Sequence, residues 1–103
     1  MRSAHAALLL PAAIAAATLN VPGEYPDIPA AISAAQDGDT VLVSPGTFGG
    51  PVGFQGKNIV LRSVAGPEQT VINTFSDFHA VMFTGAEDST AVLEGFTVSN
   101  FYP

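Results

Sequence analysis

The chain has 103 residues, enough for one domain, and its three basic residues against nine acidic ones give a formal net charge of −6. This acidic balance argues against nucleic acids and anionic membranes as partners, because both attract basic surfaces. The absence of cysteine excludes disulfides and thiolate metal sites, so the fold must rely on packing.

The N-terminal segment, residues 1–17, has the pattern of a secretory signal peptide. Arg2 supplies a positive charge, an apolar run follows from Ala6 to Ala17, and Ala15-Ala16-Ala17 offers the small residues that a signal peptidase needs. The alternative is a buried N-terminal helix, but Pro11 would break its interior. We therefore expect cleavage after Ala17 and a secreted, periplasmic or extracellular product. Residues 18–103 keep two basic and all nine acidic side chains, and no later apolar run is long enough for a membrane span.

A helix is predicted from Ile28 to Gln36. Asp27 can cap its first amides, Pro29 falls in the first turn, and Gly38 offers a left-handed stop. One face of this helix is apolar at helical spacing and consists of Ile28, Ala31, Ile32 and Ala35.

The rest of the chain reads as short apolar strands separated by turn residues. The predicted strands are Thr40–Val43, Ile59–Arg62, Thr70–Ile72, Ala80–Phe83, Ala91–Leu93 and Phe96–Val98. Their apolar residues recur at similar offsets, from Val41 to Ile59, from Ile59 to Val81 and from Val71 to Val92. Offsets of about 20 positions predict stacked parallel coils, with the seven phenylalanines mostly in the internal column or its turns.

An antiparallel sandwich is the rival fold, since closely spaced short strands also fit it. Asn-Gly and Asp-Gly hairpin turns between these strands are absent, and Asp37-Gly38 falls at the helix end instead. This favours the stacked coils.

Several motifs support the same choice. They are Tyr25-Pro26-Asp27-Ile28, the alanine-rich run from Ala30 to Ala35, Gly38-Asp39-Thr40-Val41 and Pro45-Gly46-Thr47-Phe48. In this order they resemble the start of the right-handed parallel β-helix proteins of the pectin-lyase-like superfamily. The resemblance continues more loosely over nearly everything after residue 18.

The resemblance implies an all-β, right-handed parallel β-helix (solenoid) with a short N-terminal amphipathic capping helix. Residues 18–103 would hold the cap and the first three to four coils, continued by further coils beyond Pro103. Enzymes of this superfamily carry their acids, arginines and calcium ligands on middle coils, so calcium is expected only with a longer protein. The early Gly-x-Tyr-x-Glu signature of pectin methylesterases is not met by Gly46-Thr47-Phe48-Gly49-Gly50.

The remaining constellations carry weak chemical signals. Asp37 and Asp39 could offer carboxylates to calcium, but a helix stop and turn is the simpler interpretation. Glu87, Asp88 and Glu94 could form an acidic patch of glycosidase type, or they line a solvated loop.

Single residues add little. His79 is the only histidine after residue 17 and has no second ligand beside it in the sequence. Lys57 and Arg62 could contact an acidic sugar, although solvated surface charges are the commoner case. Asn73 and Asn100 each end a predicted strand, and their side chains could form hydrogen bonds along an internal ladder of asparagines stacked in neighbouring coils. No catalytic, cofactor-binding or metal-binding residue is assigned.

Two function classes remain. The first is a non-catalytic exported solenoid that binds polysaccharide or a cell-envelope surface. The alternative is the N-terminal part of a polysaccharide lyase or glycoside hydrolase whose active site lies in later coils. We also expect end-to-end self-association through a C-terminal coil that lacks a cap.

Overall fold

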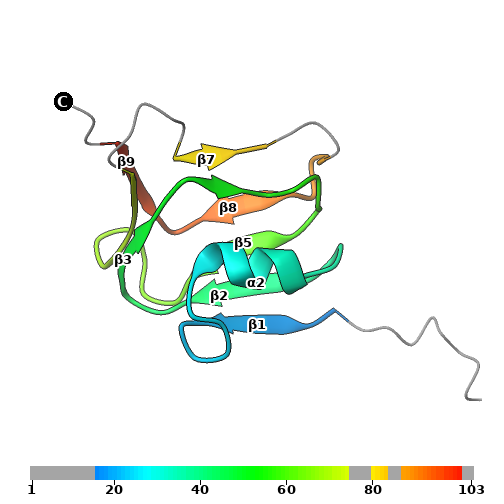
Figure 1. Ribbon diagram of the computed structural model, residues 1–103, viewed down its shortest axis with the longest axis horizontal. Helices are drawn as coiled ribbons and strands as arrows, with labels where there is room; N and C mark the ends of the chain where they lie inside the picture. The colour runs from blue at the N-terminus through cyan, green and yellow to red at the C-terminus, as the bar shows by residue number, and fades with distance from the viewer. Residues whose placement is uncertain (1–15, 75–79, 84–86, 101–103) are drawn as a thin grey trace, which may run out of the picture.

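A computed structural model describes residues 16–74, 80–83 and 87–100 of the chain. It is a parallel β-solenoid of about three turns with one short helix (Figure 1). The predicted leader lies outside the described residues as far as residue 15. In the part that the structure describes, no helix is long and apolar enough to cross a membrane.

The chain alternates short strands with turns after a single helix. In chain order the elements are β1 (Thr18–Val21), α2 (Ile28–Ala34), β2 (Thr40–Val43), β3 (Gly46–Gly49), β4 (Val52–Gly53), β5 (Val60–Ser63), β6 (Thr70–Thr74), β7 (Val81–Met82), β8 (Val92–Glu94) and β9 (Thr97–Asn100).

The strands form three parallel sheets that share the turns of the solenoid. Sheet A has the order β1-β2-β5-β8, sheet B has the order β3-β6-β9, and sheet C consists of β4 and β7. All pairs are parallel and in register, as in the pairing of Val41 with Leu61 and of Leu61 with Leu93. Every coil therefore places its side chains directly over those of the previous coil, which contradicts the antiparallel sandwich.

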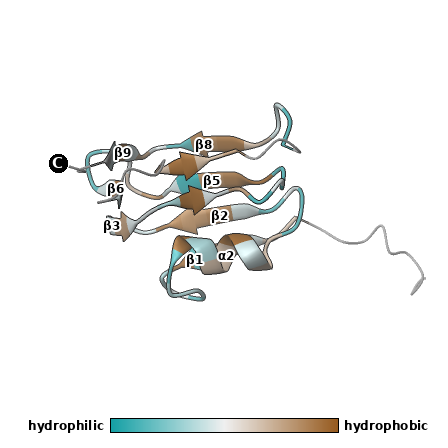
Figure 2. Ribbon diagram, turned by 45° about the horizontal axis from the view of Figure 1, so that its top comes forward, coloured by the Kyte–Doolittle hydropathy of each residue, from teal (hydrophilic) through white to brown (hydrophobic). Residues whose placement is uncertain are grey.

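The core consists of columns of apolar side chains that run through the coils. In sheet A the inward column is Leu19, Val41, Leu61 and Leu93, and the first three of these are buried. Figure 2 shows the hydrophobic residues concentrated in strands β2, β5 and β8, with hydrophilic residues in the turns between them. Buried and more exposed side chains alternate along β1, β2 and β5, as the period of a β-strand requires.

The predicted phenylalanine column is confirmed in part. Phe54 is fully buried, and Phe48 and Phe96 pack against the core. Phe83 stacks on Phe54 with ring centroids 4.5 Å apart but remains 51% exposed. The other three phenylalanines lie outside the described residues.

Helix α2 begins where the sequence predicts and ends two residues earlier. Asp27 caps it by accepting a 2.8 Å hydrogen bond from the Ala30 amide. The predicted stop at Gly38 is wrong, because the chain leaves the helical conformation at Ala35, which is already extended. Gly38 has a φ of +92° and serves the following turn instead. α2 packs its buried side against β1, β2 and β4.

The strand predictions are confirmed for β2 and nearly so for the others. β5, β7, β8 and β9 begin one residue later than predicted, and β1, β3 and β4 were not predicted as strands.

The predicted stacking of the coils is correct in kind but wrong in all three pairs. Val41 stacks on Leu61 rather than on Ile59, which precedes β5. Val81 stacks on Val52 in sheet C, and Val71 and Val92 belong to different sheets. The partners in sheet A are Leu19, Val41, Leu61 and Leu93, so the last step along the sequence is much longer than the first two. It is longer because the chain between β5 and β8 also forms β6 and β7.

Candidate functional site

Sheet A presents a continuous outer face, which we define by the outward residues of its four strands. They form two rows across the strands: Thr18, Thr40, Val60 and Val92 in one, and Asn20, Leu42, Arg62 and Glu94 in the other. All eight side chains are half-buried or exposed, whereas their neighbours along each strand point into the core. The outer face is thus an accessible, regularly spaced surface.

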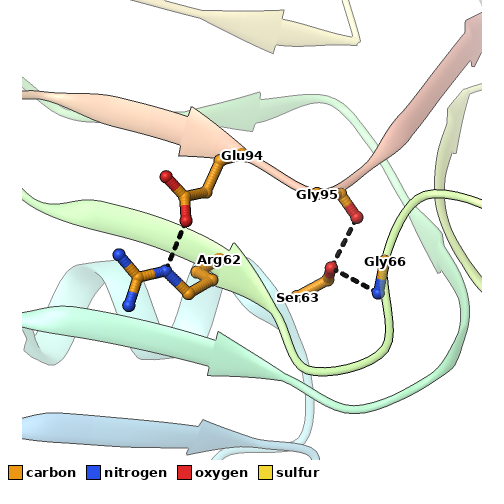
Figure 3. A network of polar contacts seen from close by, with 5 residues as sticks. All are labelled: Arg62, Ser63, Gly66, Glu94 and Gly95. Atoms are coloured by element: carbon orange, nitrogen blue, oxygen red, sulfur yellow. Dashed lines mark hydrogen bonds and ion pairs between the residues drawn. The ribbon is translucent and has the colours of Figure 1, made fainter.

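Arg62 and Glu94 are the charged pair of this outer face (Figure 3). The Arg62 Nε donates a 2.6 Å hydrogen bond to Glu94 Oε2, and the two side chains are 49% and 50% exposed. In-register stacking of β5 and β8 brings the two residues together. Because water screens such a pair, its contribution to the free energy of unfolding is small. Its remaining donors and acceptors stay available to an external ligand.

The turn beside this pair is held by Ser63. The Ser63 Oγ donates to the Gly95 carbonyl and accepts a 3.0 Å hydrogen bond from the Gly66 amide (Figure 3). Gly95 has a φ of +84°, and an added Cβ there would collide with Ser63 Oγ. This contact ties the turn after β5 to the turn after β8.

A polar ladder connects the turns before β2, β5 and β8. Asp37 Oδ1 accepts a 2.8 Å hydrogen bond from the Asn58 amide, and Asn58 Oδ1 accepts a 2.6 Å bond from the Asp88 amide. These bonds satisfy backbone groups that the strands leave open. The ladder is therefore structural, and no sequence motif marked it, because its members lie 21 and 30 residues apart.

Asp39 is a buried carboxylate with two backbone donors. Its oxygens accept a 2.8 Å hydrogen bond from the Ala17 amide and a 2.9 Å bond from the Gln36 amide. These amides lower the pKa of Asp39 below its ordinary value, the Ala17 bond having the larger effect. Asp37 and Asp39 thus support a turn, as the simpler interpretation predicts.

Lys57 differs from its prediction as a solvated surface charge. Its Nζ donates to the carbonyls of Ile32, Ser33 and Ala35 at 2.7, 3.0 and 2.8 Å. The last carbonyls of a helix lack intrahelical partners and carry the negative end of its dipole. Lys57 therefore caps the carboxyl end of α2 and is occupied by that role.

The predicted acidic patch does not form as one group. Glu94 lies at the carboxyl end of β8 with Arg62, whereas Glu87 and Asp88 precede that strand. Glu87 accepts a 2.8 Å hydrogen bond from the Gly56 amide. Asp88 accepts hydrogen bonds from the hydroxyl and the amide of Thr90, and these bonds lower the pKa of the Asp88 carboxyl, the hydroxyl having the larger effect. A paired acid and base for glycoside hydrolysis is not assembled from these three.

The predicted asparagine ladder is out of register by one residue. Asn73 stacks on Ser99, whose hydroxyl lies 3.4 Å from Asn73 Oδ1, and Asn100 follows opposite Thr74. His79, the remaining candidate, lies outside the described residues.

The described carboxylates are mostly committed to the fold. Seven of the eight accept a hydrogen bond from within the chain: Glu24, Asp27, Asp37, Asp39, Glu87, Asp88 and Glu94. Over residues 16–74, 80–83 and 87–100 there is no group of three metal-ligating side chains, and no pocket is formed.

Comparison with known proteins adds no relative. No protein-family model, no curated protein and no solved structure matches the chain.

Proposed function

We propose that this chain belongs to an exported, right-handed parallel β-helix protein that binds polysaccharide or a cell-envelope surface without catalysis. The observation that carries the proposal is the outer face of sheet A, with its half-exposed Arg62–Glu94 pair. The parallel solenoid and the resemblance to the start of pectin-lyase-like proteins support the handedness and a capping role for α2. The leader-like residues 1–17 support export.

Charge narrows the ligand class. The chain carries a net charge of −6, and a polyanion such as pectate would be repelled unless cations bridged the two. Neutral polysaccharides offer hydroxyl groups, which pair with guanidinium donors and carboxylate acceptors. A neutral polysaccharide is therefore the preferred ligand.

Affinity electrophoresis through gels that contain different neutral polysaccharides tests this proposal. We expect retardation of the protein in at least one gel, and Arg62→Ala or Glu94→Ala should weaken binding about tenfold, the value of one hydrogen bond to a charged group. Glu68→Ala removes an exposed carboxylate that precedes β6 and is the matched control. Equal retardation of all variants, or none in any gel, would contradict the proposal. Release of soluble sugars would instead favour the alternative, a polysaccharide lyase or glycoside hydrolase.

A specific observation also favours self-association between two copies of the chain. Phe83 lies over the buried Phe54, and Val98 lies over the buried Ile72. No described side chain stacks on Phe83 or Val98 in turn, and the two are 51% and 44% exposed. Both are uncharged, so a second acidic copy meets less repulsion here than elsewhere. Two such ends would cover each other in an isologous contact.

Sedimentation equilibrium measures this association. We expect a dimer whose dissociation constant rises at least tenfold in Val98→Asp, because the contact would bury a charge. Val64→Asp alters another exposed valine, which follows β5 and ends no column, and should leave association unchanged. A monomer at all concentrations would rule out the contact.

A further inference from the structure

The folded chain uses Ala17, and this bears on where the leader is removed. The Ala17 amide donates its 2.8 Å hydrogen bond to Asp39 Oδ1, and the Ala17 carbonyl accepts a 2.9 Å bond from the Thr40 amide. Ala17 thus extends the pairing of β1 with β2 by one residue before Thr18. It belongs to the first coil.

The sequence offers two processing sites of the same kind. A signal peptidase requires small residues at the first and third positions before the bond that it cleaves. Ala15 and Ala17 satisfy this requirement for cleavage after Ala17, and Ala13 and Ala15 satisfy it for cleavage after Ala15. The site after Ala15 therefore meets the same requirement as the site after Ala17, which is the one expected from the sequence.

The two sites would give mature chains of different stability. Cleavage after Ala17 would remove one of the two amide donors of Asp39, a carboxylate that is only 8% exposed. It would also remove the carbonyl that binds Thr40. Asp39 would then keep only the Gln36 amide as a donor. Loss of a hydrogen bond to a buried charged acceptor is costly, whereas cleavage after Ala15 keeps both bonds of Ala17.

We infer that a signal peptidase cleaves the bond between Ala15 and Ala16, so that the mature chain begins at Ala16. The reaction is a hydrolysis: water supplies a hydroxyl group to the Ala15 carbonyl carbon and a proton to the Ala16 nitrogen as the peptide bond breaks. This inference rests on the proposed export of the chain, because an intracellular chain meets no signal peptidase.

Intact mass and N-terminal sequencing of the exported protein test the inference. The complete sequence, from Met1 to Pro103, is expressed in a secreting bacterial host, together with two variants that each disable one site. Ala13→Leu places a large residue at the third position before the Ala15–Ala16 bond and leaves the site after Ala17 intact. Ala17→Leu places a large residue directly before the Ala17–Thr18 bond and leaves the small residues of the site after Ala15 intact.

We expect the wild-type chain to begin at Ala16. Ala17→Leu should be processed at the same bond, and Ala13→Leu should reduce processing there at least tenfold. A wild-type chain that begins at Thr18, with processing blocked by Ala17→Leu, would overturn this inference and leave export intact. Retention of Met1 in the recovered protein would overturn both the inference and the proposed export.

Discussion

Lys57 contributes to stability through three hydrogen bonds to the end of α2. Lys57→Met keeps most of the apolar stem and removes the charge. We expect the free energy of unfolding to fall by about 2 kcal/mol, since hydrogen bonds of charged groups contribute about 1.5–3 kcal/mol. Urea denaturation measures this change.

Arg62→Met is the matched control for Lys57. Arg62 is half exposed and its pair with Glu94 is screened by water, so the expected loss is at most about 1 kcal/mol. Equal losses in the two variants would show that Lys57 does not cap the helix.

Asp39 should make stability depend on acid pH. Its folded pKa is lowered by the amides of Ala17 and Gln36, so the unfolded chain binds its proton first as the pH falls. The contribution of Asp39 is therefore complete above the unfolded value of about 3.9 and disappears as the pH falls through the folded pKa.

Urea midpoints between pH 7 and pH 3 measure the contribution of Asp39. The wild-type midpoint should fall steeply at the acid end, and Asp39→Asn should begin lower at pH 7 and fall less. Parallel curves for the two proteins would contradict the role assigned to the Asp39 carboxylate.

At the scale of elements, the turn between β8 and β9 depends on a glycine. Gly95→Ala should cost about 1–2 kcal/mol for the left-handed backbone and more for the collision with Ser63 Oγ. Gly38→Ala is the control, because Gly38 has a similar φ of +92° and an added Cβ there would meet no atom within 4 Å. The difference between the two variants in thermal unfolding isolates the collision. A Gly95→Ala variant no less stable than Gly38→Ala would contradict the packing of Ser63 against this turn.

Local signals predicted some elements and missed others for physical reasons. Asp27 and Pro29 mark the start of α2 because both act on adjacent backbone groups. Lys57 caps the end of α2 from a position 22 residues beyond Ala35, and no local pattern could predict that contact. β3 and β4 contain three glycines in six residues, and such segments lack the β-branched pattern of a strand. They become strands only because β6 and β7 pair with them.

The candidate surface was also only partly predictable. Arg62 and Glu94 were both considered from the sequence but in different groups, because 32 residues separate them. Only the register of β5 on β8 brings them together. The register depends on the length of the chain in each coil, which differs from coil to coil. A single repeat period read from the sequence therefore could not predict which residues stack.

At the scale of the whole molecule, the core and the outer face both depend on the stacking of the coils. Each coil contacts only its neighbours, so the parallel register between coils determines the columns, the polar ladder and the outer face. An antiparallel arrangement of the same strands would separate Arg62 from Glu94 and Asp37 from Asn58.

Nuclear Overhauser effects between backbone protons of the isotopically labelled protein test this register most directly. The solenoid predicts contacts of parallel type between Val41 and Leu61 and between Leu61 and Leu93. Contacts between opposing α-protons of β2 and β5, the mark of antiparallel pairing, would contradict the account.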